Sequence, residues 1–238
     1  TAITTGVQNV VLGGRALQAN TVGADNVAIG YQALFANVDG SRSVAIGSNA
    51  LVAQEPASAG EMHNVAIGYN AGTAITTGTN NTLIGGLAGD ALTSGVNNVA
   101  IGQGALSSQV LFGQNVAIGY RALLNQNNSG HANNTAIGMQ AGMSVTTGSA
   151  NTFVGSSAGT GLTTGVDNVA VGAGTLISAN GGNRSVAIGK NALSAQNAGS
   201  AGQNMYNTAV GYVAGQSITT GTKNALIGGD VGVSLTIG

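Results

Sequence analysis

The chain has 238 residues, of which 41 are glycine and none is cysteine, which excludes disulfides, thiol catalysis and zinc–thiolate sites. Apolar residues make up 43% and aromatic residues only 3%, so any core has to be built from Val, Ile, Leu and Ala in thin, closely packed layers. Six basic and seven acidic side chains give a formal net charge of -1, which disfavours nucleic acid and anionic lipid as partners.

One motif, N-x-x-I-G or a close variant, recurs along the whole chain and closes on a glycine, here termed the anchor. The anchors are Gly13, Gly30, Gly47, Gly68, Gly85, Gly102, Gly119, Gly138, Gly155, Gly172, Gly189, Gly211 and Gly228. Successive anchor numbers differ by 17 in nine cases, as from Gly13 to Gly30, and by 21, 19 and 22 at the third, seventh and eleventh intervals. A short unit repeated in this way predicts a solenoid in which each copy is one turn, or rung.

The three residues before each anchor have the character of a β-strand. An apolar residue directly precedes the anchor in every copy, Val or Thr most often stands two residues earlier, and Ala most often lies between them. Because side chains alternate across a strand, Val and Ile share one face and Ala the other, so both faces are apolar. A 17-residue coil covers only one face from its own interior, and we expect the alanine face to pack on another chain.

A second glycine follows most anchors by ten residues, as at Gly78, Gly148 and Gly221. Two corners per unit predict two short strands per turn. The sequence lacks an apolar stripe with a 3.6-residue period, so a helix is not favoured. The sequence therefore predicts an all-β fold, a parallel β-solenoid (β-roll) of about thirteen rungs forming one domain over residues 1–238. The segment TAITTG at 1–6 recurs at 73–78, so we expect the chain to be part of a longer fibre, without membrane insertion in this segment.

A higher-order repeat of four units spans roughly seventy residues. Four residues after the anchor, pairs of Leu alternate with pairs of Gly, and Leu17 departs from that pattern. Every fourth unit carries a corner insertion, at 52–63, 124–133 and 194–206. Solenoid corners tolerate insertions, but these loops are also the candidate receptor contacts. The contact candidates are Glu55, Glu61, His63, Asn127, His131, Asn197 and Tyr206.

Asparagine stands four residues before most anchors, with Ser43 and Ser185 as the exceptions. Rungs about 4.8 Å apart would place these amides above one another, so they are expected to form a structural asparagine ladder. Its members are Asn9, Asn26, Asn64, Asn81, Asn98, Asn115, Asn134, Asn151, Asn168, Asn207 and Asn224.

The sequence contains few residues of the types that enzymes use for catalysis. GSSAG at 155–159 matches the G-x-S-x-G pattern of a hydrolase nucleophile, but sister units fill the slot of Ser157 with Asn70, Leu87 or Gln140. Only His63 and His131 could complete a triad or bind a metal. We therefore expect no enzyme activity, no metal and no cofactor.

The units NVAIGYQAL at 26–34, NVAIGYRAL at 115–123 and SVAIGKNAL at 185–193 resemble the head repeats of YadA-like trimeric autotransporter adhesins. They are still more similar to the repeats of bacteriophage and other viral fibre proteins. The resemblance implies three identical chains packed in parallel and displayed outside a cell or on a virion surface. The repeat of YadA-like heads is shorter, and this sequence shows neither a coiled-coil stalk nor a membrane anchor.

The sequence and this resemblance together predict a non-enzymatic fibre segment of an extracellular attachment apparatus, a phage tail fibre or a surface adhesin. Its expected partners are two further copies of itself and a cell-surface receptor or glycan contacted through the edge loops. The alternative is a monomeric β-solenoid that binds ice, glycan or matrix through a flat face rich in Thr and Asn. Tyrosines after the anchors at 31, 69, 120 and 212 and the Thr pairs of the TTG segments are the residues that this alternative would use.

Overall fold

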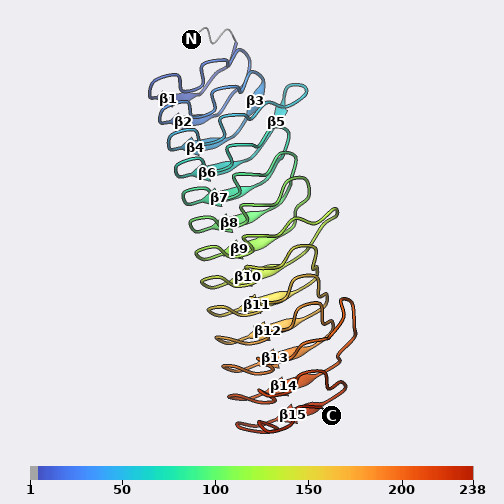
Figure 1. The fold of residues 1–238 in the computed structure, drawn as a ribbon. Helices are drawn as coiled ribbons and strands as arrows, with labels where there is room; N and C mark the ends of the chain where they lie inside the picture. Colours follow the sequence, from blue (N-terminus) through green and yellow to red (C-terminus); the bar gives the residue numbers. More distant parts are fainter. Residues whose placement is uncertain (1–4, 238) are drawn as a thin grey trace. The chain divides into compact units, whose positions relative to one another are not determined.

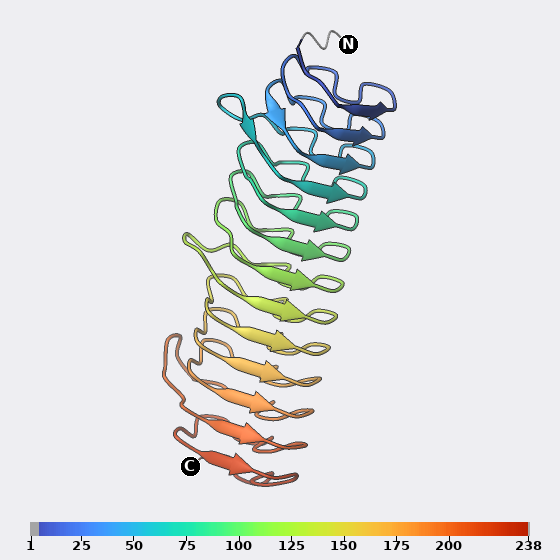
Figure 2. The ribbon, with the colours of Figure 1, turned by 180° about the vertical axis from the view of Figure 1, so that it is seen from behind.

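The computed structural model describes residues 5–237, and the described part of the chain is all-β, without a helix. It forms a parallel β-solenoid of about thirteen turns, seen from two sides in Figures 1 and 2. The chain divides into two compact units, residues 1–115 and 116–238, which are described separately here. The expectations placed on residues 1–4 and on Gly238 lie outside the described residues.

Each turn contributes one three-residue strand directly before its anchor. The strands of the first unit are β1 (Val10–Leu12), β2 (Val27–Ile29), β4 (Val44–Ile46), β6 (Val65–Ile67), β7 (Thr82–Ile84) and β8 (Val99–Ile101). Those of the second are β9 (Val116–Ile118), β10 (Thr135–Ile137), β11 (Thr152–Val154), β12 (Val169–Val171), β13 (Val186–Ile188), β14 (Thr208–Val210) and β15 (Ala225–Ile227). Neighbours pair in parallel and in register, so that Val27 lies beside Val44 and Ala28 beside Ala45.

The prediction of two strands per turn is wrong for most turns. A second strand pair is present only between β3 (Gly40–Ser41) and β5 (Gly60–Glu61), with two isolated bridges in the second unit, as far as residues 5–237 are concerned. Elsewhere the segment around the second glycine still bonds to the next turn, as when Thr93 N donates to Val110 O at 2.8 Å. A residue with positive φ follows shortly afterwards in each turn, for example Asn97 at 57°, and it interrupts a regular strand.

The alanines of the strands face the interior of their own coil, which corrects the expectation that they pack on another chain. Ala28 in β2 is fully buried, whereas Val27 and Ile29 on either side of it are half-buried and face outward. The physical reason is that a coil this narrow also has to bury a Leu and an Ala from the opposite corner, such as Leu34 and Ala33. Little more than a methyl group fits at the strand centre.

Alternation of Leu and Gly after the anchors compensates for the size of the strand-centre residue. Phe153 replaces Ala at the centre of β11, and the two nearest turns carry Gly142 and Gly159 at the corner slot. A Cβ on these glycines would lie 2.8 and 2.3 Å from the Phe153 ring. Gly72 and Gly89 flank Leu83 in the same way. The four-unit repeat thus places a small corner residue wherever the central residue of the neighbouring strand is large.

The anchor glycines are required by both conformation and space. Gly30 has φ of +128°, and a Cβ there would lie 2.7 Å from the carbonyl carbon of Gly47 on the next turn. An L-residue adopts this backbone only with strain, and the neighbouring backbone could not move aside without breaking the stack. This explains why glycine closes every strand.

Candidate interaction surface

The asparagines of the predicted ladder lie inside the coil and bind the turns together. Asn81 illustrates the arrangement. Its backbone N–H donates to the Asn64 side-chain oxygen at 3.0 Å, and its own amide nitrogen donates to Gly95 O at 2.8 Å. Because most of these groups are fully buried and satisfied within the chain, they have a structural role and offer no contact to a ligand.

Two of the insertion-bearing turns use a serine and a glutamine where the ladder lacks an asparagine. The Gln54 side chain exchanges hydrogen bonds with Ser43 at 3.1 and 3.2 Å and accepts one from Asn64 at 2.9 Å. Gln196 repeats this arrangement with Ser185 and with Asn207. The loops therefore leave the coil from a closed polar network.

The structure separates the candidate contacts of the three insertions into inward and outward groups. Glu55 is half-buried and accepts a hydrogen bond from Val38 N, so its carboxylate has a structural partner. Asn197 accepts one from Gly199 N within its own loop, but its side chain is exposed and belongs to the outward group. The side chains of Glu61, His63, Asn127, His131 and Tyr206 are exposed. Buried methionines, Met62 and Met205, fix the first and third loops to the coil.

Three of these candidates, Glu61, His63 and Tyr206, belong to two rows of mostly charged side chains, and the sequence reasoning missed the other members of both rows. The first charged row consists of Asp25, Arg42, Glu61 and His63. The second charged row consists of Asp167, Arg184, Tyr206 and Lys223. A signal was present in the sequence, because Asp25 and Arg42, like Asp167 and Arg184, are one repeat apart and fill the same slot of successive turns.

Glu61 is the centre of the first charged row. Its carboxylate pairs with the Arg42 guanidinium and lies 2.9 Å from His63 Nε2. The hydrogen bond from His63, followed by the charge of Arg42, lowers the pKa of Glu61 below its ordinary value. In the second charged row the hydrogen bond to Tyr206 raises the pKa of Arg184, which keeps its charge at any physiological pH.

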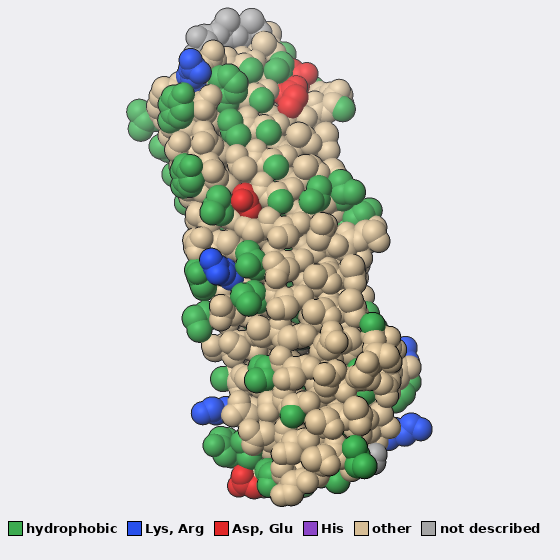
Figure 3. Space-filling model, in the orientation of Figure 1, with side chains coloured by type: hydrophobic (Ala, Val, Ile, Leu, Met, Phe, Trp, Pro, Cys, Tyr) green, Lys and Arg blue, Asp and Glu red, His purple; other side chains and the backbone are tan. Residues whose placement is uncertain are grey.

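An apolar stripe runs along the outward face of the strands in each unit, and Figure 2 shows the side on which the strands lie nearest to the reader. The first and third residues of each strand form it, most often Val or Thr in the first position and Ile or Val in the third, on either side of the buried central residue. Ile137 and Ile188 are each 38% exposed although each has a strand on both sides. The opposite side, drawn in Figure 3, is dominated by uncharged polar groups and backbone, with few charged side chains.

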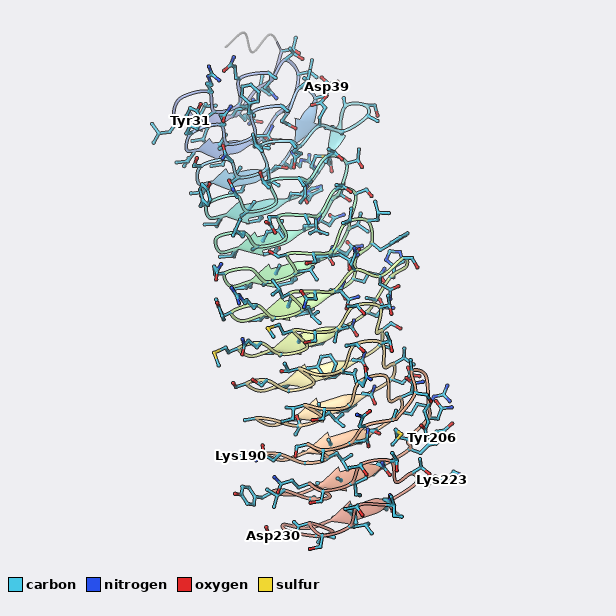
Figure 4. The ribbon with its side chains drawn as sticks, in the orientation of Figure 1. Tyr31, Asp39, Lys190, Tyr206, Lys223 and Asp230 are labelled. Atoms are coloured by element: carbon cyan, nitrogen blue, oxygen red, sulfur yellow. The ribbon has the colours of Figure 1, made fainter. Side chains whose placement is uncertain are left out.

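Tyrosines that follow an anchor project from the corner at the end of the strand. Tyr31, Tyr69 and Tyr212 are 51, 61 and 57% exposed, and Arg121 lies 5.0 Å from the ring centroid of Tyr120. They stand on separate turns without a shared ligand cage. In the second unit, Lys190 and Asp230 lie at the edge opposite to that of Tyr206 and Lys223 (Figure 4).

Among the described residues, the first threonine of each TTG pair donates its hydroxyl to the next turn, and so does Thr93 of the related segment TSG. Thr76 Oγ1 donates to Thr93 O at 3.3 Å, Thr93 Oγ1 to Val110 O at 3.0 Å, and Thr146 Oγ1 to Thr163 O at 3.2 Å. These donors are therefore committed to neighbouring turns. None of the described contacts favours the flat binding face of the alternative function.

Ser157, in the hydrolase-like pattern, lies half-buried in a tight turn with φ of +59°. Within residues 5–237 there is no pocket and no group of three His, Asp or Glu side chains placed to bind a metal ion. No helix in that range is long and apolar enough to cross a membrane. Comparisons with protein-family models, curated proteins and solved structures give no match.

Proposed function

We propose that this chain is a non-enzymatic fibre segment of an extracellular attachment structure, such as a phage tail fibre or a surface adhesin, and that three copies assemble in parallel. The observation that carries the proposal is the apolar stripe on the outward face of the strands. Apolar side chains that recur from turn to turn on one face and stay half-buried or exposed are typical of an interaction surface.

A further copy of the same chain is the partner that fits this stripe best. The outward residues repeat with the spacing of the turns, about 4.8 Å, and only a partner with the same spacing matches them along its whole length. In the second unit, Lys190 and Asp230 lie at one edge of the strands and Tyr206 and Lys223 at the other (Figure 4), as a polar rim lies around the apolar centre of an interface.

Threonines within the stripe would fix the axial position of the copies. Thr82, Thr135, Thr152 and Thr208 occupy the outward slot where most other strands have Val. In a parallel assembly without axial offset, equal hydroxyls meet and can bond to one another. An offset of one turn would place several of them against Val, which leaves polar groups without a partner.

Light scattering of the full chain tests the assembly. A mass near three times 22.9 kDa is expected, and Ile137→Glu together with Ile188→Glu should reduce it to that of one chain. Thr147→Glu is the matched control, because Thr147 is exposed but lies outside the stripe. A folded wild-type chain of 22.9 kDa at all concentrations, or equal dissociation of the control, would contradict the proposal.

A further inference from the structure

The second charged row presents cations and one aromatic ring from successive turns of the second unit. Asp167, Arg184, Tyr206 and Lys223 each stand five residues before an anchor. Figure 4 shows Tyr206 and Lys223 at the same edge of β14 and β15. All four side chains are exposed, so a ligand can reach them without any change in the fold.

Two neighbours orient the guanidinium of Arg184. Its Nε lies 3.5 Å from Asp167 Oδ2, and its Nη1 donates to the Tyr206 hydroxyl at 3.0 Å. The guanidinium carbon is 5.8 Å from the centroid of the Tyr206 ring. These contacts restrict the rotamers of a side chain that otherwise loses considerable entropy on binding, while neither of them uses Nη2.

The second charged row carries excess positive charge, unlike the first. Arg184 and Lys223 against Asp167 give 2 − 1 = +1, whereas Arg42 against Asp25 and Glu61 gives 1 − 2 = −1 with His63 neutral. Within residues 5–237 no carboxylate forms an ion pair with Lys223. The loop 194–206 contains no acidic residue, so nothing there replaces Glu61.

We infer that Arg184, Tyr206 and Lys223 bind a carboxylate-bearing polysaccharide, an inference that rests on the proposed attachment function and names its ligand class. A guanidinium matches the planar geometry of a carboxylate, the Lys223 ammonium supplies a second charge, and the Tyr206 ring offers an apolar face to sugar C–H groups. A single shallow site of this kind has a low affinity, and three copies of it on one fibre would raise the overall affinity for a long polysaccharide.

A polysaccharide fits better than a nucleic acid. Nucleic-acid binding draws on several phosphate contacts at once, and this chain has six basic side chains in all against seven acidic ones. The Arg184 guanidinium also lies over one face of the Tyr206 ring, so only the other face is free for a ligand. Stacking of successive nucleic-acid bases needs a more open aromatic surface.

Polygalacturonate is the probe, with dextran as the uncharged polymer and an oligothymidylate as the phosphate polymer. Calorimetry with the full chain at low and moderate salt should show binding to polygalacturonate alone. We expect Arg184→Gln and Lys223→Gln each to weaken it about tenfold, and Tyr206→Leu to weaken it less. Arg42→Gln removes the equivalent cation from the first charged row and should leave the affinity unchanged.

Several outcomes would overturn the inference. They are the absence of polygalacturonate binding, tighter binding of the oligothymidylate, and an equal loss in Arg42→Gln, which would indicate only unspecific charge attraction. Circular dichroism of each variant separates a lost site from a lost fold. Light scattering gives the mass independently, so a monomeric wild type that still binds would count against the trimer and leave the site intact.

Discussion

The third and eleventh turns, which begin at Gly47 and Gly189, are alike inside and different outside. Inside, Gln54 and Gln196 bond to Ser43 and Ser185 with the same pair of distances, 3.2 and 3.1 Å. Both loops return to the coil through a fully or almost fully buried methionine. The same Ser–Gln pair therefore supports the stacking in both turns, and Gln54 makes one further bond, from Nε2 to Asn37 Oδ1 at 3.1 Å, where the eleventh turn has Ala179 at the corresponding position.

Outside, the first loop places Glu61 between Arg42 and His63, whereas the third places Tyr206 against Arg184. In the first charged row the carboxylate of Glu61 occupies Arg42, whereas the loop beside the second charged row offers no carboxylate to Arg184. The comparison teaches that the interior of an insertion-bearing turn constrains its sequence strongly and the exterior hardly at all. Differences in binding between the loops therefore have to come from the exposed residues.

Replacing the anchors should have the largest effect and strike both turns equally. A Cβ on Gly47 would lie 2.4 Å from Gly68 O, and one on Gly189 would lie 2.3 Å from Gly211 O, in both cases at positive φ. We expect Gly47→Ala and Gly189→Ala each to lower the free energy of unfolding by about 3 kcal/mol or more.

Urea unfolding followed by circular dichroism measures this loss. Gly130→Ala is the control, because a Cβ there has no neighbour within 4 Å, and its effect should stay within about 0.5 kcal/mol. A harmless substitution at either anchor would show that the turns are not equivalent inside.

Gln54→Ala and Gln196→Ala should come second. Each opens a cavity and leaves buried hydroxyl and amide groups without their partner, at a cost of about 2–3 kcal/mol. The same unfolding measurement applies, and Asn125→Ala, at an exposed position in the second insertion-bearing turn, is a control with little expected loss. The loss at Gln54 should be the larger of the two, because it also leaves buried Asn37 without its donor, and a larger loss at Gln196 would contradict this assignment.

Glu61→Gln should sharpen the exterior contrast with a smaller effect. It removes the carboxylate that occupies Arg42, so the first charged row comes to resemble the second. We expect the affinity for polygalacturonate to rise about threefold at low salt and the rise to vanish at high salt. An unchanged affinity at low salt would mean that Glu61 does not close the row.

The smallest expected effect is on the titration of Glu61. Its pKa is lowered in the folded chain, so its ionised form contributes stability above the ordinary value of 4.5, and that contribution is lost as the pH falls through the folded value. His63→Ala should raise the pKa of Glu61 more than Arg42→Gln does, because the hydrogen bond from His63 is the largest cause. NMR titration of the side-chain carboxyl measures both shifts, and the reverse order would contradict this assignment.

Sequence reasoning predicted the parallel solenoid and the positions of its turns, because a short repeat that keeps a 17-residue spacing in nine of twelve intervals leaves few other folds. It was wrong about the second strand and about which chain covers the alanines. Of the charged rows it named only Glu61, His63 and Tyr206, although the slot of the other members was visible. Counting back five residues from each anchor places Arg184 and Tyr206 in the same slot of successive turns despite the insertion between them, but the hydrogen bond between their side chains had to come from the structure.

The sequence by itself determined where each turn begins and ends, because glycine and asparagine meet backbone requirements that recur locally in every copy. Only the tertiary structure decided which strand face is the interior. That choice depends on how much volume the corners already fill, as Leu34 shows. It has φ of 50°, a conformation that costs roughly 1–2 kcal/mol for an L-residue, and its complete burial offsets this cost. Local preference alone would not have placed a leucine there.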